Sequence, residues 1–279
     1  MADDTFAADP SRRPLRPSLH FGTIVVVGGG CYGGYYVRQL LRAHRSGAVG
    51  WRSLVVVDHD PECAVGRLTL PDRPPGLELV HQGWSDFFAA YLDRAANDAD
   101  AHANDAIVPS PLMPHLMADW LVDRARRRWP RREIRVVPLH SPVAVPWQRA
   151  GEDGTHYVSF ADWMCPINCI EPARCPETRG PRSWSMPTAM ADYAAGPTVG
   201  DVAVGEPLIL HCSHRAYGVG MIDVRDVVAS DALLAARGDQ AASAFLIGTV
   251  SHCHGALRRI EVGAQPPARL GEPDDAPGD

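Results

Sequence analysis

Short apolar runs that alternate with helical patterns constrain the fold of this chain more than any other feature. Runs of strand length, rich in Val, Ile or Leu, occur five times in the first half, as TIVVVG, SLVVVD, LELV, DAIV and EIRVVPL. Three of them precede segments with apolar residues at helical spacing, namely YYVRQLLRAHRSG, SDFFAAYLDRAAND and SPLMPHLMADWLVDRARRRWP. Strands that alternate with helices predict a parallel sheet with helices on both faces. We therefore expect a doubly wound α/β domain over residues 21–145.

The third helical segment contains signals for its own start and end. Ser110 is a favourable N-cap residue, and Pro111 fits the first turn of a helix. Leu112, Leu116 and Trp120 recur on one face, and Pro130 cannot continue the helix. The pattern predicts a helix that begins at Ser110 and ends before Pro130.

The second half of the chain is organised differently. A hairpin is predicted around residues 152–154, and the strand-like runs GEPLIL and ASAFLIGTV flank a helical segment near DVVASDALLAAR. We expect residues 146–263 to form a Cys- and His-rich metal-binding segment with a small C-terminal α/β extension. Residues 1–20 and 264–279 are rich in Pro, Asp, Ala and Gly, so we predict disordered tails there.

Composition excludes several classes of protein. The formal net charge of −6 argues against a nucleic-acid or anionic-membrane surface, which needs a concentrated positive face. No apolar run reaches membrane-spanning length, and the N-terminus lacks the apolar core of a signal peptide, so a cytoplasmic protein is expected. The sequence contains no lysine, so all 27 Lys+Arg residues are arginine. Schiff-base chemistry and a phosphate-binding P-loop lysine are therefore excluded.

The first apolar run leads into a glycine-rich turn. Gly28, Gly30 and Gly33 fit the pattern G-x-G-x-x-G, with Gly29 between the first two, and Asp58 ends the second run. In such a turn the first glycine permits a tight bend, the second lets the backbone approach a pyrophosphate, and the third lets the helix pack closely. The strand before the turn and the helix after it are the context that this motif requires.

These residues resemble the NAD(P)-binding Rossmann superfamily, including its TrkA-N-like and siroheme-dehydrogenase-like members. The resemblance covers the first half of the chain. It implies a Rossmann-like fold with a dinucleotide bound by Gly28, Gly29, Gly30 and Gly33. It also implies that Asp58 binds the adenosine ribose, and hence that the cofactor is NAD rather than NADP. The alternative is a Rossmann-like domain that has lost its nucleotide.

The segment WMCPINCIEPARCPETRGPRSW places Cys165, Cys169 and Cys175 within a few residues of one another. Its prolines exclude a helix or a central strand, so these cysteines are expected on an irregular loop that a metal would hold. Cys212 and Cys253 each follow an apolar run and are candidates for the fourth ligand, as is a histidine. Four thiolates suit either zinc or an iron–sulfur cluster, and the spacing leaves both open. The remaining cysteines, Cys31 and Cys63, are predicted to be structural.

Four histidines flank the later cysteines. His211 and His214 surround Cys212, and His252 and His254 surround Cys253. Because both clusters come at strand ends, where ligand sites of α/β sheets form, we list these histidines as candidate proton-transfer groups. Each is equally compatible with an ordinary hydrogen-bonded histidine. Glu171 and Arg174, within the cysteine loop, are candidate substrate contacts.

The two signatures together predict an NAD-dependent oxidoreductase that carries a metal centre, either zinc or iron–sulfur, near the far end of the dinucleotide. A regulatory or sensory protein, in which nucleotide occupancy is linked to metal or redox state without turnover, is the main alternative. A third is a purely structural zinc clip. We expect a small-molecule substrate or redox partner, no nucleic acid and no membrane. The sequence leaves open whether the chain forms a homo-oligomer.

Overall fold

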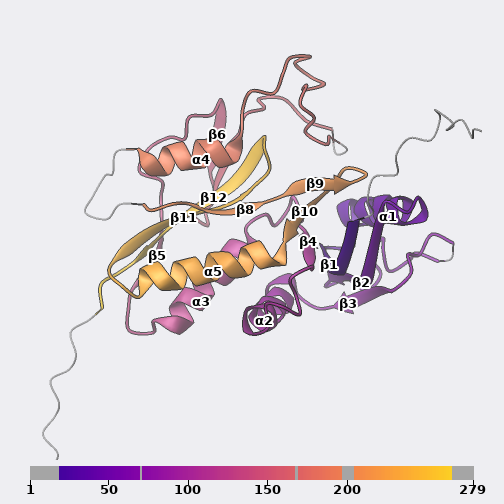
Figure 1. Cartoon of the computed structure of the whole chain (residues 1–279), viewed down its shortest axis with the longest axis horizontal. Coiled ribbons are helices and arrows are strands. Elements are labelled where there is room, and N and C mark those ends of the chain that lie inside the picture. Colours follow the sequence, from indigo (N-terminus) through magenta and orange to yellow (C-terminus); the bar gives the residue numbers. More distant parts are fainter. Residues whose placement is uncertain (1–18, 70, 167–168, 197–203, 266–279) are drawn as a thin grey trace, which may run out of the picture.

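The computed structural model describes residues 19–69, 71–166, 169–196 and 204–265. Within these ranges the chain forms two six-stranded sheets and five helices (Figure 1). The predicted α/β class is thus confirmed. The tails expected over residues 1–20 and 264–279 lie almost entirely outside the described ranges.

The first sheet combines four parallel strands with two antiparallel ones. Its strand order is β3-β2-β1-β4-β10-β9. The parallel strands are β1 (Leu19–Val27), β2 (Val49–Asp58), β3 (Leu77–His81) and β4 (Ala106–Val108). The antiparallel strands are β10 (Val219–Asp223), which pairs with β4, and β9 (Ser213–Ala216). The sheet is therefore mixed, whereas the sequence pattern predicted only parallel strands.

Helices cover both faces of this sheet because its central strands β1 and β2 contain continuous buried apolar runs, residues 24–27 and 54–57. In α1 (Cys31–Arg45), Val37 and Leu40 pack against Ile24 and Val26 on one face. On the other face α2 (Trp84–Asn97) packs through Phe88 and Leu92 against the alternate strand residues. Burying side chains of this size contributes about 1.5–3 kcal/mol each.

The second sheet contains residues from both expected halves of the chain. Its order is β6-β7-β12-β11-β8, with β5 also paired to β12. Only β11 and β8 are parallel, and the other pairs are antiparallel. Its strands are β5 (Ile134–Val137), β6 (Trp147–Ala150), β7 (His156–Ser159), β8 (Leu208–His211), β11 (Ser243–Val250) and β12 (His254–Val262).

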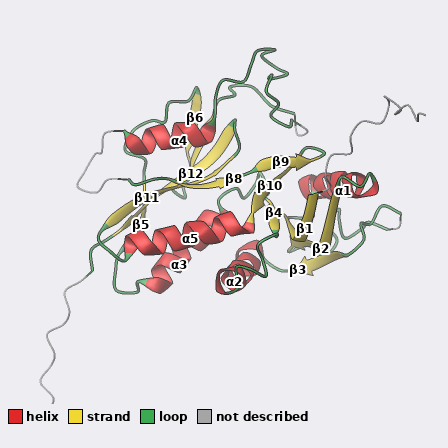
Figure 2. Cartoon of the chain, in the orientation of Figure 1, coloured by secondary structure: helices red, strands yellow, loops and turns green. Residues whose placement is uncertain are grey.

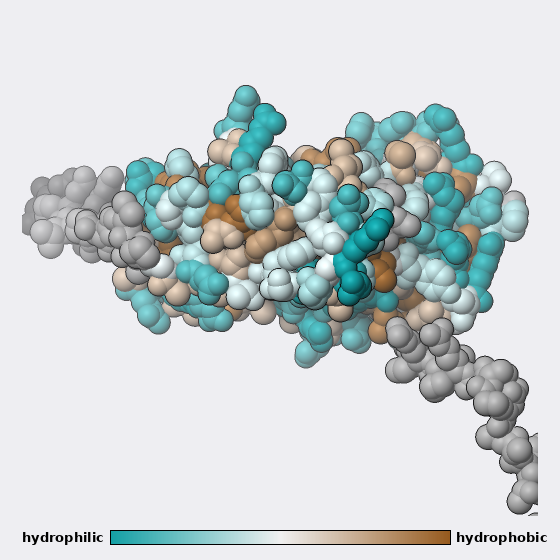
Figure 3. Space-filling model, turned by 90° about the horizontal axis from the view of Figure 1, so that it is seen from above, coloured by the Kyte–Doolittle hydropathy of each residue, from teal (hydrophilic) through white to brown (hydrophobic). Residues whose placement is uncertain are grey.

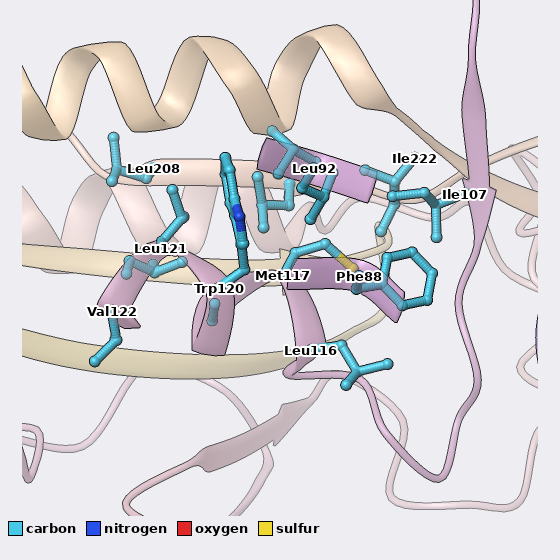
Figure 4. Packing of buried hydrophobic residues seen from close by; sticks show 14 of the residues in the cluster. Phe88, Leu92, Ile107, Leu116, Met117, Trp120, Leu121, Val122, Leu208 and Ile222 are labelled. Carbon is cyan, nitrogen blue, oxygen red and sulfur yellow. The ribbon is translucent and has the colours of Figure 1, made fainter. Parts of the chain in front are cut away.

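The two sheets share one hydrophobic core. Helices α3 (Leu116–Arg128) and α5 (Val224–Gly238) lie next to each other with α2 to one side (Figure 2), and all three contribute residues to this core. In Figure 4 Leu208 of the second sheet lies beside Leu121 and Trp120, and Ile107 of the first sheet lies beside Phe88 at the other side of the same cluster. The opposite face of the second sheet is covered by α4 (Met186–Ala195). Seen from above (Figure 3), hydrophobic residues gather in small groups among hydrophilic ones on the described surface.

Three expectations differ from the structure. The run EIRVVPL was expected in the first sheet, but β5 pairs antiparallel with β12 in the second. The helix expected from Ser110 begins at Leu116, because Pro111 and Pro114 interrupt the segment before it. The expected small extension is a full second sheet. The hairpin predicted around residues 152–154 is confirmed as β6 and β7, with Gly154 at a φ of 78°.

Candidate functional site

The glycine-rich turn joins β1 to α1, and its three motif glycines occupy three different environments. Gly28 has a φ of 83°, which only glycine adopts readily, so it makes the bend. A Cβ at Gly33 would overlap the carbonyl oxygen of Gly28, so this glycine permits the close packing of helix on turn. A Cβ at Gly30 would meet nothing within 4 Å. Gly30 therefore faces open space.

That open space is a cavity of about 490 Å³, here called the glycine-turn cavity. Its walls include Gly28, Gly30, Gly33 and Asp58, but Gly29 does not line it, because Gly29 packs against Cys63. No side chain caps the first turn of α1, and that turn contains no acidic residue. The first N–H groups of a helix have no partner within the helix, so this turn is suited to an anion, which the helix dipole also favours.

Asp58 is buried at the end of β2, with 5% of its surface exposed, and it holds the turn in place. Its Oδ2 accepts a hydrogen bond from the N–H of Gly29 at 2.6 Å, and its Oδ1 accepts one from the N–H of Asp60 at 2.9 Å. A carboxylate has about four acceptor sites, so each oxygen retains a lone pair for a further donor. Asp58 therefore combines a structural role with a place on the cavity wall.

A second cavity, of about 560 Å³, adjoins the first and is here called the cysteine cavity. Four of the five predicted metal ligands line it, namely Cys165, Cys169, Cys212 and Cys253. Cys212 follows β8, Cys253 lies in the turn from β11 to β12, and the other two come from the loop that rises above β8 and β9 in Figure 1. Tyr32 and Ser110 line both cavities.

Cys175 lies outside the walls of the cysteine cavity. It belongs to a short antiparallel turn of the loop, in which its N–H donates to the carbonyl of Gly180 at 3.0 Å and Arg174 is bridged to Pro181. Arg174, a candidate substrate contact, does not line the cavity either. Within the described ranges, no three His, Cys, Asp or Glu side chains converge closely enough to hold a single metal ion.

Glu171 anchors the cysteine loop to the turn between β11 and β12. Its carboxylate, 6% exposed, accepts hydrogen bonds from the hydroxyl of Ser251 at 2.6 Å and from the N–H groups of His252 at 2.8 Å and Cys253 at 3.0 Å. Its backbone has a φ of 48°, unusual for a residue other than glycine. Burial alone raises the pKa of this carboxyl, but the donors outweigh burial, so its pKa lies below its ordinary value. Its contacts identify Glu171 as an anchor of the loop.

The four candidate histidines divide into two pairs. His214 and His254 line the cysteine cavity, and the Nδ1 of His254 lies 2.9 Å from the hydroxyl of Ser159. His211 and His252 lie outside its walls and pack edge to face, with ring centroids 4.9 Å apart. Burial lowers the pKa of His211, His214 and His254 below the ordinary value of 6.5. These imidazoles are therefore neutral at pH 7 and suited to accept a proton.

Three of the cavity thiols have a pKa above the ordinary value of a cysteine. Burial raises the pKa of Cys212 and of Cys253 to about 12. Burial also raises the pKa of Cys165, its neighbour Cys169 raises it further, and the indole N–H of Trp163 opposes both effects. Any metal that binds these thiols must displace their protons.

Several residues of the site were not identified from the sequence. The cysteine cavity is also lined by Tyr32, Tyr36, Thr249 and Ser251, and the indole N–H of Trp184 donates to the Cys253 Sγ at 3.2 Å. Burial raises the pKa of Tyr36 to about 12, so its hydroxyl remains a donor. Tyr32 lies inside the glycine motif, and Ser251 directly precedes His252. Their places next to predicted site residues are the feature of the sequence that could have identified both.

Comparison with known proteins identifies one family. A family model described as AF_1314_C, "Uncharacterized protein, C-terminal domain", matches residues 117–263. No curated protein and no solved structure matches the chain. The matched range begins in α3, continues through both sheets and contains the whole cysteine loop. None of the helices in the described ranges has both the length and the apolar character that crossing a membrane requires.

Proposed function

The chain belongs to the AF_1314_C family, and from its two adjoining cavities we propose that it is an NAD-dependent oxidoreductase with a metal centre. In this proposal the first sheet is a Rossmann-like nucleotide-binding unit, whose strand order β3-β2-β1-β4 and helices on both faces suit a dinucleotide at the glycine turn. The metal, zinc or an iron–sulfur cluster, and a small-molecule substrate or redox partner occupy the cysteine cavity.

One observation carries this proposal. The glycine-turn cavity and the cysteine cavity share Tyr32 and Ser110, so a nucleotide that places its pyrophosphate at Gly30 extends toward thiols and neutral imidazoles. The thiols and imidazoles of the cysteine cavity would then lie at the end of the bound cofactor, and a redox enzyme must place its cofactor's reactive end against such groups. Proton transfer falls to His214 and His254, because these two histidines line the cavity.

The charges around the glycine-turn cavity favour NAD over NADP. Asp58, Asp60 and Glu62 line it with one arginine, Arg67. Three carboxylates repel the extra phosphate of NADP, whereas a carboxylate at the end of β2 is a good acceptor for the ribose hydroxyls of NAD.

The cysteine cavity fits a metal by the chemistry of its donors. Cysteine thiolates bind zinc and iron–sulfur clusters, and a resident metal would convert the high-pKa thiols into stable thiolates. The regulatory alternative is favoured by one contact. Glu171 joins the cysteine loop to the turn that carries Cys253, and Tyr32 and Tyr36 line the same cavity. A change in the state of a metal there can therefore be transmitted to these tyrosines, beside the nucleotide, without turnover.

The test is a titration of purified protein with NAD and NADH, together with an assay of NADH oxidation by an artificial electron acceptor. Wild type is compared with Gly30→Ala, which places a methyl group in the glycine-turn cavity. The control is Gly180→Ala, since a Cβ there would make ordinary contacts with Thr178 only. We expect NADH-dependent turnover for which Gly30→Ala requires at least about ten-fold more NADH, whereas Gly180→Ala behaves as wild type. Binding without turnover would support the regulatory alternative, and absence of binding would refute the proposal.

A further inference from the structure

The four cysteines of the cysteine cavity surround a space instead of meeting at a point. Zinc with four thiolate ligands at about 2.3 Å requires sulfur atoms about 3.8 Å from one another. In the described ranges no three potential ligands converge in that way, although Cys165, Cys169, Cys212 and Cys253 line one cavity. A group that is itself several atoms wide suits four thiols that line one cavity without converging on a single ion.

Two tryptophans place donors beside these sulfurs. The indole N–H of Trp184 donates to Cys253, and Trp163, two residues before Cys165, has a buried Nε1 that forms no hydrogen bond of regular geometry within the described ranges. An indole N–H is a donor only, and a neutral thiol is a weak acceptor. Both donors therefore suit sulfurs that carry negative charge, as cluster-bound thiolates do.

Further unpaired polar atoms gather around the same cavity. Among the described residues, the hydroxyl of Thr249 on the cavity wall forms no hydrogen bond, and neither do Nε and Nη1 of Arg182, which lies behind Glu171 outside the cavity wall. The nearest carboxylate to Arg182 is Glu171 at 3.9 Å, whose oxygens already accept three hydrogen bonds. Buried polar atoms without hydrogen bonds are rare, and those beside this cavity suit a charged group bound within it.

We infer that the cysteine cavity binds an iron–sulfur cluster through Cys165, Cys169, Cys212 and Cys253, and that Cys175 is not a ligand. A cluster ligated by four thiolates is wide enough to reach thiols on separate walls. Its net negative charge is balanced by Arg182 and by the indole donors. The redox role of the cluster rests on the proposed function, whereas its presence is tested independently.

The test is anaerobic reconstitution of the full chain with ferrous iron and sulfide, followed by absorption spectroscopy and by iron, sulfide and zinc analysis. We expect a broad absorption band at about 400 nm and about two to four iron atoms per chain, with one sulfide for each iron atom. Cys169→Ser and Cys253→Ser lose at least about ten-fold of this absorbance, and Cys175→Ser, the matched control, keeps it. Circular dichroism of each metal-free variant confirms that it is folded.

Stoichiometric zinc with no cluster on reconstitution would overturn the inference, as would loss of the cluster in folded Cys175→Ser. NAD titration of the same samples separates this result from the proposed function. A chain that binds NAD but no cluster refutes the inference alone. A chain that binds the cluster but no NAD refutes the dinucleotide-dependent function and leaves the inference standing.

Discussion

Replacement of Glu171 tests how the cysteine loop is held against the second sheet. Glu171→Ala removes the acceptor for one hydroxyl and for two backbone N–H groups, those of His252 and Cys253. Leaving a buried donor without a partner costs about 1–3 kcal/mol. The Cys253 N–H also donates to the Ser251 hydroxyl at 3.3 Å, so of these two donors only the His252 N–H loses its acceptor outright, which predicts a loss of about 1–3 kcal/mol, partly offset where water reaches the opened turn. The positive φ of Glu171 costs about 1–2 kcal/mol, but alanine at this position bears the same cost. The backbone strain therefore does not change the expected loss.

The assay is urea denaturation of the metal-free chain together with limited proteolysis of the loop. The matched control is Glu177→Ala, an exposed glutamate of the same loop that should change the free energy of unfolding by less than about 0.5 kcal/mol. We expect Glu171→Ala to lower the unfolding free energy or, if the loop detaches locally, to expose it to protease. A variant as stable and as resistant to protease as the control would refute the anchoring role.

The same contact predicts a pH dependence. Because the pKa of Glu171 in the folded protein lies below its ordinary value of 4.5, its stabilising contribution is complete above that pH. The contribution is lost as the pH falls through the folded-state pKa. The stability difference between wild type and Glu171→Gln should therefore be constant at neutral pH and shrink in acid. A difference that grows on acidification would contradict this assignment.

Three further predictions follow from the packing and the pKa shifts. Gly30→Ala should raise the Kd for NAD at least about ten-fold, which corresponds to about 1.4 kcal/mol, with little loss of stability. Gly33→Ala should instead destabilise the fold, and thermal unfolding of both variants measures this difference. Phe88→Ala, in the core shared by both sheets, should cost about 3–5 kcal/mol and leave a single cooperative urea transition seen by all probes; two separate transitions would disprove a common core. NMR titration should give His254 a pKa below 6.5, and protonation at or above that value would contradict its burial.

Strands β1, β2 and β4 could be predicted because each contains a continuous apolar run. Strands buried on both faces need apolar side chains at every position, as residues 24–27 and 54–57 have, and such runs are visible in the sequence. The glycine turn was visible for a related reason, because bend and close packing require glycine at fixed positions. Helix α4 was missed although Ser185 caps it and accepts from the N–H of Thr188. Its short length and alanine-rich pattern gave little periodicity.

Strand β12 was missed because two of its buried residues are arginines. Arg258 is only 5% exposed, and its guanidinium bonds to Asp119, Asp153 and Thr155, which lie far away in the sequence. A buried charge is tolerated when partners surround it, but those partners are brought together only by the fold. The run HGALRRIEV therefore reads as polar in the sequence and is the central strand of the second sheet in the structure.

The distribution of the cysteines shows why spacing alone could not define the site. Cys165, Cys169 and Cys175 are neighbours in sequence, yet the turn closed between Cys175 and Gly180 directs the third away from the cavity that the first two line. Cys212 and Cys253 are distant in sequence but adjacent in space, because parallel pairing of β8 with β11 sets His211 against Val250 at the same end of both strands. Sheet register thus supplies two walls of the cavity, and the Glu171 anchor supplies the other two by fixing the loop over them. A metal ligand set assigned from spacing within the loop would include Cys175, and one assigned from register excludes it, which is why Cys175→Ser is the variant that separates the two.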